Sequence, residues 1–291
     1  MTPQAQVTAL LCCALGEDVA PLTALQAGQL LLRMQDAGVT GLPRTVGAAE
    51  LAALGFSAEF SARAAALLSR PDALRRYTAR NAPLTVLAAD EPGFPARLLR
   101  LGAQCPPVLF CRGDAALLQT RCIALVGSRN ASPGALRFAR RIGALCAAEG
   151  LTLVSGNAAG ADRAAQDACL QGGGSVVSFV PDALCRHAQA ERRLFVSEHG
   201  ADVPFSAARA LSRNRLIHAL GAAAVVAACT PERGGSWSGA RENLRRGLSR
   251  LCVPDDDSPG SLALLALGAT PIPENVRSIG KYAVTELSIF D

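Results

Sequence analysis

The sequence predicts an α/β fold with a doubly wound, mostly parallel sheet, preceded by a small helical domain. From residue 121 onward, short apolar segments alternate with helical ones. The apolar segments lack polar alternation, which is typical of parallel strands covered by helices on both faces. Residues 1–80 instead show helical periodicity without convincing strands. We therefore expect a helical domain over 1–80, a connector and lead-in to the sheet over 81–120, and the doubly wound domain over 121–291.

The helical domain is expected from four segments with apolar residues at helical spacing. These segments are 7–15, 22–38, 48–55 and 58–70. Gly55 stands between the last two, so a helix-hairpin-helix-like or SAM-like DNA-binding arrangement is one interpretation. A glycine between two short helices is weak support for it, and a packing module is the interpretation we prefer.

The connector contains seven prolines and glycines between Asp90 and Gly113, together with two short strand-like segments, 84–88 and 107–113. The alternating region follows. Its expected strands are 121–127, 151–156, 175–181, 194–198, 223–229 and 251–254, and its expected helices begin at Pro133, at Ala161, near Ala207 and near Gly239. In such sheets ligands lie beyond the carboxyl ends of the strands, at helix N-termini. Loops at these ends are therefore the first places to look for a site.

The loop after strand 121–127 contains Gly127, Ser128 and Arg129, and Ser132 with Pro133 then begins a helix. A capped helix after a tight turn explains Gly127 and Ser132. It does not explain Arg129, because a cation beside a helix N-terminus opposes the helix dipole. An anion between the two would reconcile them. The loop lacks both the GxGxxG and the GxxxxGK[ST] spacing, so neither NAD nor ATP is expected.

Three further segments have composition suited to phosphate. The loop after strand 151–156 is rich in glycine and ends in an acidic residue, although a purely structural turn explains it equally well. Two arginines and an amide begin the helix after residue 212, although a solvated helix face is the usual fate of such charges. Glycines and a serine before the helix near Gly239 could form a backbone nest. The candidate phosphate-binding residues are Gly127, Ser128, Arg129, Ser155, Gly156, Gly160, Asp162, Arg213, Asn214, Arg215, Gly234, Gly235 and Ser236.

The charge distribution favours an anionic partner. The net charge is +5, but residues 121–250 hold 17 arginines against 9 acidic residues. Such clustering is expected of a protein that binds a polyanion. Lys281 is the only lysine, so the preference for arginine over lysine has a simpler explanation in genomic base composition. Aromatic residues make up only 4% of the chain, and base-stacking platforms are therefore scarce. The single tryptophan, Trp237, is expected to cap a core edge rather than to stack.

Several classes of site and location are not expected. None of the ten cysteines lies in a CxxC motif and most stand in apolar runs, which indicates reduced, buried thiols in a cytoplasmic protein. The three histidines form no ligand-spaced cluster, so neither a metal site nor a catalytic triad is expected, and we assign no catalytic residue and no cofactor. The N-terminus lacks a basic targeting region, and residues 216–229, the longest apolar stretch, are too short to span a membrane.

The order of these motifs resembles the DNA-processing protein A family, DprA, also called Smf. The similarity runs from about Asp90 to Glu274 and rests on GSR at 127–129, SG-x₃-G-x-D at 155–162 and SRNR at 212–215. It implies a Rossmann-like domain and a cytoplasmic, non-enzymatic protein. Such a protein binds and protects single-stranded DNA, dimerises, and assists RecA loading in natural transformation and recombination. By position, Arg129, Ser155, Gly156, Arg213 and Arg215 would contact DNA phosphates.

The chain departs from that family pattern at two places. Residues 182–193 are shorter than usual and lack the family's basic residue, for which Arg186, Arg192 or Arg193 could substitute. The motif at 234–244 differs, and we expect a divergent member that lacks the C-terminal winged helix of many members. These departures bear more on RecA loading than on DNA binding. Because the charge of residues 1–80 is nearly balanced, we expect that segment to be dispensable for binding DNA.

A rival class shares the broader fold. Nucleoside-monophosphate-cleaving enzymes carry PGGxGTxxE with a catalytic glutamate, and Glu242 could imitate that residue. The spacing differs and the PGG sequence is missing, so a binding module is preferred over an enzyme. A sensor of a nucleotide-derived signal is a third alternative.

Overall fold

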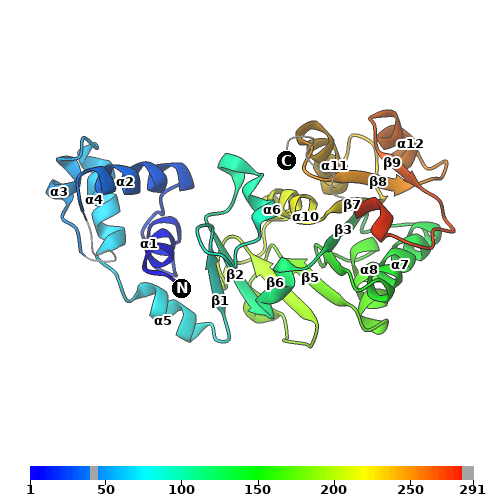
Figure 1. The fold of residues 1–291 in the computed structure, drawn as a ribbon, viewed down its shortest axis with the longest axis horizontal. Coiled ribbons are helices and arrows are strands. Elements are labelled where there is room, and N and C mark those ends of the chain that lie inside the picture. Colours follow the sequence, from blue (N-terminus) through cyan, green and yellow to red (C-terminus); the bar gives the residue numbers. More distant parts are fainter. Residues whose placement is uncertain (40–44, 284–291) are drawn as a thin grey trace.

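The computed structural model describes residues 1–39 and 45–283, and it confirms the expected α/β class. Its described residues contain a nine-stranded sheet with helices on both faces (Figure 1). In sheet order the strands are β1 (Thr85–Ala88), β2 (Val108–Gly113), β6 (Arg193–Ser197), β5 (Ser175–Phe179), β4 (Thr152–Ser155), β3 (Cys122–Gly127), β7 (Ala223–Ala228), β8 (Arg250–Pro254) and β9 (Thr270–Ile272).

The strand order fixes where a ligand site can form. The seven strands from β6 to β9 along the sheet pair in parallel, whereas β1 and β2 pair antiparallel with each other and β2 pairs antiparallel with β6. The chain leaves β3 outward through β4, β5 and β6, and then returns to place β7 on the other side of β3. The direction of winding therefore reverses between β3 and β7, and a crevice opens at the carboxyl ends of strands at such a point.

Helices cover the two faces of the sheet separately. One face carries α7 (Pro133–Ala148) and α8 (Ala161–Gln171), and the other carries α6 (Ala96–Leu99), α10 (Asn214–Leu220), α11 (Gly234–Arg246) and α12 (Pro259–Ala266) (Figure 1). Alternate residues of β3 serve the two cores: Ile123 and Leu125 face α7 and α8, whereas Ala124 and Val126 face α10. Gly143 permits the close contact of α7 with α8, because a Cβ there would lie 2.0 Å from the Ala165 carbonyl oxygen.

One helix start differs from the expectation. The helix expected near Gly239 begins five residues earlier, at Gly234, whereas the helices expected near Ala207 and after residue 212 correspond to α9 (Ala207–Ser212) and α10. Hydrophobic spacing alone does not locate such ends, because the glycines at 234 and 235 favour a loop locally and tertiary contacts decide. The segment after β8 also adds α12 and β9, which were not expected as separate elements.

The N-terminal helices are joined to the sheet through a shared core. These helices are α1 (Pro3–Cys12), α2 (Ala24–Asp36), α3 (Ala48–Ala52), α4 (Ala58–Leu68) and α5 (Ala73–Arg80). Figure 1 shows α1 and α5 beside β1 and β2, with α2, α3 and α4 farther out. Buried residues of α1 and α5, including Tyr77, pack with Val86, Phe110 and Phe195 of the sheet. Removing residues 1–80 would uncover this apolar face, which argues against that segment being dispensable.

The ten cysteines are all free thiols. Six are buried, three are half-buried, and Cys185, in the loop between β5 and β6, is exposed. Burial raises the pKa of Cys229 to about 11.

Within residues 1–39 and 45–283, no helix has both the length and the apolar character needed to cross a membrane.

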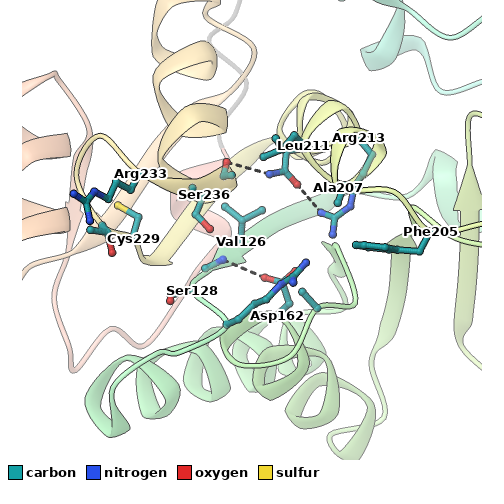
Figure 2. Close-up of a pocket in the computed structure, with 18 residues that line it drawn as sticks. Val126, Ser128, Asp162, Phe205, Ala207, Leu211, Arg213, Cys229, Arg233 and Ser236 are labelled. Atoms are coloured by element: carbon teal, nitrogen blue, oxygen red, sulfur yellow. Dashed lines mark hydrogen bonds between the residues drawn. The ribbon is translucent and has the colours of Figure 1, made fainter.

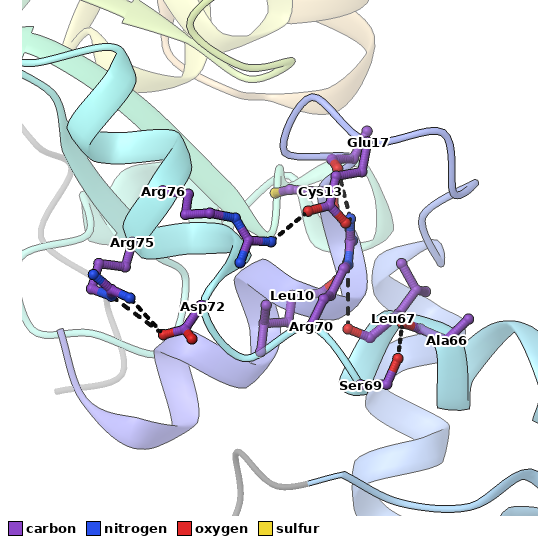
Figure 3. A network of polar contacts seen from close by, with 11 residues as sticks. Leu10, Cys13, Glu17, Ala66, Leu67, Ser69, Arg70, Asp72, Arg75 and Arg76 are labelled. Carbon is purple, nitrogen blue, oxygen red and sulfur yellow. Dashed lines mark hydrogen bonds and ion pairs between the residues drawn. The ribbon is translucent and has the colours of Figure 1, made fainter.

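Arg70 ties the C-terminal end of α1 to the end of α4 (Figure 3). It is 8% exposed, and its guanidinium donates to the carbonyl oxygens of Leu10 at 2.9 Å, Cys13 at 2.7 Å and Ala14 at 2.7 Å. Helices leave their last carbonyls without partners inside the helix, so this one side chain satisfies acceptors that would otherwise be buried and unpaired. It also forms an ion pair with Glu17 at 3.4 Å.

Replacing Arg70 with alanine is expected to lower the free energy of unfolding by about 3 kcal/mol or more, because several buried carbonyls lose their donor. Arg75→Ala is the matched control, since Arg75 lies nearby, is exposed and pairs with the likewise exposed Asp72. That control should change stability by less than about 0.5 kcal/mol. Urea denaturation followed by circular dichroism measures both values, and equal effects of the two substitutions would contradict the account of Arg70.

Candidate functional site

A cavity of about 650 Å³ lies at the carboxyl ends of β3 and β7, where the winding of the sheet reverses (Figure 2). Loops from four parts of the chain meet around it: the segment after β3, the segment after β4, the region of α9 with the start of α10, and the segment from the end of β7 into α11. Arg213 and Phe205 lie toward one end of the cavity, and Arg233 and Cys229 lie toward the other (Figure 2). This is the crevice that the strand order requires.

Asp162 connects the ends of β3 and β4. Its side chain lies in the first turn of α8 and is only 3% exposed. One carboxylate oxygen accepts a hydrogen bond from the Gly127 amide at 3.1 Å, and the other accepts one from the Gly156 amide at 3.1 Å. Burial raises the pKa of Asp162, while the charge of Arg213 and the backbone amides oppose that rise. The carboxylate therefore fixes the two loops relative to each other.

Gly160 lets those same loops touch. It has a φ of +82°, and a Cβ there would lie 2.4 Å from the Ser128 carbonyl oxygen and 2.5 Å from that of Arg129. The Ser128 carbonyl in turn accepts a hydrogen bond from the Ala161 amide at 3.2 Å. A side chain at position 160 would both clash and require a left-handed backbone conformation, so only glycine fits.

Arg213 is buried, with 6% of its surface exposed, yet it reaches the cavity. Its guanidinium donates to the Gly156 carbonyl at 2.8 Å and to the Asn214 side-chain oxygen at 2.6 Å. Asn214 in turn donates to the Gly235 carbonyl at 3.0 Å, so a chain of hydrogen bonds joins the β4 loop, α10 and α11. Burial lowers the pKa of Arg213. Its Nε atom is buried and has no partner within the described residues.

Two exposed arginines face the same cavity. Arg129 follows β3 and Arg233 precedes α11, and neither guanidinium has a hydrogen-bond or ion-pair partner within the part of the chain that the structure describes. Helix α11 begins at the cavity, because its first residues Gly234, Gly235 and Ser236 line it and no side chain of the described residues caps its N-terminus. Three guanidiniums and this helix N-terminus therefore border one cavity, and the carboxylate among its lining residues, Asp162, accepts hydrogen bonds from backbone amides.

The structure brings most of the expected site residues together at this cavity. They are Gly127, Ser128, Arg129, Asp162, Arg213, Asn214, Gly234, Gly235 and Ser236. The expectation that Asp162 contacts phosphate is not supported, because both of its oxygens are occupied by amides and its charge would repel an anion. It supports the site by holding the loops.

Ser155, Gly156, Gly160 and Arg215 do not line the cavity. Ser155 is fully buried at the end of β4, and the Gly156 amide and carbonyl are used by Asp162 and Arg213. The expectation that Arg215 contacts phosphate together with Arg129 and Arg213 is not supported by its position. Arg215 forms an ion pair with the nearly buried Glu198, with one bond at 3.0 Å, and also donates to the Gln104 carbonyl. Its helix position turns it away from its neighbour at 213.

The structure adds residues that sequence reasoning missed. Phe205 and Leu211 line the cavity with 53% and 54% of their surfaces exposed, and Arg233 supplies its third guanidinium. A phenylalanine in the polar segment just before the SRNR motif was the available signal for Phe205. Trp237 is only 6% exposed and packs in the core, as expected of a residue that caps a core edge.

The remaining candidates lie outside the cavity. Arg192 donates to the Gly173 carbonyl at 2.8 Å and the Arg193 guanidinium lies over the Phe195 ring, so neither replaces the family's basic residue here. Arg186 does not line the cavity either. Glu242 forms an ion pair with Arg246 at 3.1 Å, one turn along α11. Among the described residues, no group of three or more histidine, cysteine or acidic side chains could hold a metal ion.

The chain is similar to known proteins over most of its length. Residues 85–282 match the family model described as DNA recombination-mediator protein A. Protein Smf from Escherichia coli (strain K12) is 32% identical over 188 residues, which cover 60% of this chain and 50% of that protein. Protein Smf from Synechocystis is 28% identical over 203 residues, which cover 64% and 51%. The chain thus spans about half the length of the curated relatives it matches.

The structure is also similar to solved structures, among them two of DNA processing protein A. DNA processing protein A from Streptococcus pneumoniae matches with a TM-score of 0.71 at 20% identity, covering 94% of this chain and 95% of that one, which shows a shared fold. DNA processing protein A from Helicobacter pylori, described for its unique single-stranded DNA binding mode, matches with a TM-score of 0.57 at 26% identity. That match covers 65% of this chain and 91% of the other.

Replacing Asp162 with asparagine is expected to lower the free energy of unfolding by about 2 kcal/mol. The new NH₂ group faces one of the two backbone amides and leaves it buried without an acceptor. Asp167→Asn on the same helix is the control, since Asp167 is exposed and the substitution removes the same charge. Chemical denaturation compares the two variants. If Asp162→Asn is as stable as the parent, the carboxylate does not hold the loops.

Proposed function

Because the chain belongs to the DNA recombination-mediator protein A family, we propose that its cavity binds single-stranded DNA by the phosphate backbone. The observation that carries the proposal is the convergence of Arg129, Arg213 and Arg233 on one cavity at the start of a helix. Cations at such a point are unfavourable beside the helix dipole unless an anion lies between them. A chain of phosphates is the anion that a row of separate guanidiniums suits.

The three arginines have different parts in this proposal. Arg213 is held by Gly156 and Asn214, so it offers a fixed cation to a phosphate. Arg129 and Arg233 are exposed and can follow the backbone of a flexible strand. These three arginines would contact phosphates and form no hydrogen bonds with base edges. Proteins that bind single strands of any sequence use such contacts.

The apolar part of the cavity suits bases. Phe205 is the only aromatic residue among those that line it, and Leu211 is nearby on α9. Both are more than half exposed, which is costly for large apolar side chains unless a ligand covers them. We assign Phe205 as a stacking platform for one base, beside the phosphate contacts.

We propose binding rather than catalysis for this cavity. The carboxylate that lines it accepts two backbone amides, and the raised pKa of Cys229 keeps that thiol protonated at neutral pH. Glu242, the residue that could have served a glycosidase, lies elsewhere and is paired with Arg246. No observation at the cavity favours the rival class.

The wider role is also a proposal and rests on the family. We propose that the protein is cytoplasmic, forms a homodimer, protects incoming DNA and assists RecA loading during natural transformation and recombination. Its unpaired thiols suit a reducing compartment. Light scattering tests the dimer, and a RecA strand-exchange assay with and without this protein tests the loading role.

Replacing Arg129 with alanine is expected to weaken binding of all single-stranded sequences alike. The slope of log affinity against log salt should flatten by about 0.7 for the phosphate contact that is lost. Arg140→Ala removes the same charge from exposed α7 surface outside the cavity and is the control. Fluorescence anisotropy over a salt series measures the slopes, and an unchanged slope for Arg129→Ala would make Arg129 a structural residue.

Replacing Phe205 with alanine is expected to cost about 1–3 kcal/mol of binding free energy without changing the salt slope, because stacking involves no counterion release. The measurement compares a dT oligonucleotide with an abasic one of the same length. The loss should appear only with the oligonucleotide that carries bases. An equal loss on both would show that Phe205 contacts the backbone or shapes the cavity instead.

A further inference from the structure

We propose that Tyr77, on helix α5 of the N-terminal region, is a positioning residue for the DNA cavity. It holds the segment 198–206, and this segment places Phe205 at the cavity. The inference deepens the proposed function and rests on it for the identity of the ligand. It assigns to the N-terminal helices a part in binding, although none of the described residues of that region lines the cavity.

The Tyr77 hydroxyl forms two short hydrogen bonds with this segment. It donates to the Asp202 carboxylate at 2.6 Å and accepts from the Ala201 amide at 2.7 Å. The tyrosine is only 2% exposed, and its ring makes an edge contact with Phe110 at 5.8 Å between centroids. Burial, followed by the hydrogen bond to Asp202, raises the pKa of Tyr77, so the hydroxyl stays a donor at neutral pH.

The backbone of the segment is shaped to accept this contact. Gly200 has a φ of +118°, and a Cβ there would lie 2.8 Å from the Tyr77 hydroxyl oxygen. The approach of the chain to the tyrosine thus requires glycine at that position. Arg80, one turn after Tyr77 on α5, adds an ion pair to the other Asp202 oxygen at 3.2 Å, although both partners are partly exposed.

Further contacts hold the segment on either side. Glu198 at its start is paired with Arg215 of α10, and the Pro204 carbonyl accepts a hydrogen bond from Arg209 of α9. Phe205 itself is 53% exposed, so its own packing cannot fix its position. Its location therefore depends on the backbone anchors that flank it. The contacts of Tyr77 and Arg80 come from α5, outside the parallel part of the sheet and its helices, and of these two side chains only Tyr77 is buried.

Tyr77→Phe tests the inference, because it removes only the hydroxyl and keeps the packed ring. Without DNA, hydrogen exchange of the amides in 198–206 should become about tenfold faster. With DNA, the preference for the dT oligonucleotide over the abasic one should fall by about fivefold, toward that of Phe205→Ala. The salt slope should not change, since no phosphate contact is lost. Arg75→Ala, on the same helix, should change none of these values.

The double variant Tyr77→Phe, Phe205→Ala gives the sharper comparison. If Tyr77 acts through Phe205, the double variant should lose no more affinity than Phe205→Ala alone. Two results would overturn the inference even if the parent protein binds DNA. One is a double variant whose loss of affinity equals the sum of the two single losses. The other is hydrogen exchange in 198–206 that stays unchanged in Tyr77→Phe. A parent that binds neither oligonucleotide would overturn the proposed function, and the exchange measurement would still decide whether Tyr77 orders the segment.

Discussion

The cavity depends on one buried carboxylate. Asp162 accepts the amides of Gly127 and Gly156 and so fixes the ends of β3 and β4. Arg213 can then reach the Gly156 carbonyl, and Asn214 extends the connection to α11. Backbone amides donate to the Asp162 carboxylate, and the charge of Arg213 balances it. The buried acid therefore holds the loops of a cavity whose other charged residues are cationic. An acid placed to bind a ligand cation would have been left open to solvent.

The sequence predicted the sheet well because its signals are local. Apolar strands, the Ser132 N-cap before Pro133, and glycines at the ends of β3 and β4 each act over a few residues. In such sheets ligands lie at the carboxyl ends of the strands, and nine of the candidate residues chosen on that ground line one cavity.

Other features depended on long-range contacts that no local pattern reveals. Arg213 and Arg215 look equivalent in sequence, yet one faces the cavity and the other pairs with Glu198, because residues two apart on helical backbone point to different sides. The segment that carries Phe205 is held by residues distant in sequence, including Tyr77, which bonds to Asp202. The helical region also looked separable, since nothing in residues 1–80 shows that α1 and α5 share a core with β1 and β2.

The distribution of thiols makes this chain convenient for site-directed chemistry. Of the ten cysteines, Cys185 alone is exposed, whereas burial raises the pKa of the half-buried Cys105 and Cys229 to about 11. A reagent must reach the sulfur and attack its thiolate, so a maleimide dye at near-neutral pH has one preferred target, the exposed Cys185. The natural chain therefore accepts a single fluorescent or spin label on the loop between β5 and β6, and no cysteine has to be removed first.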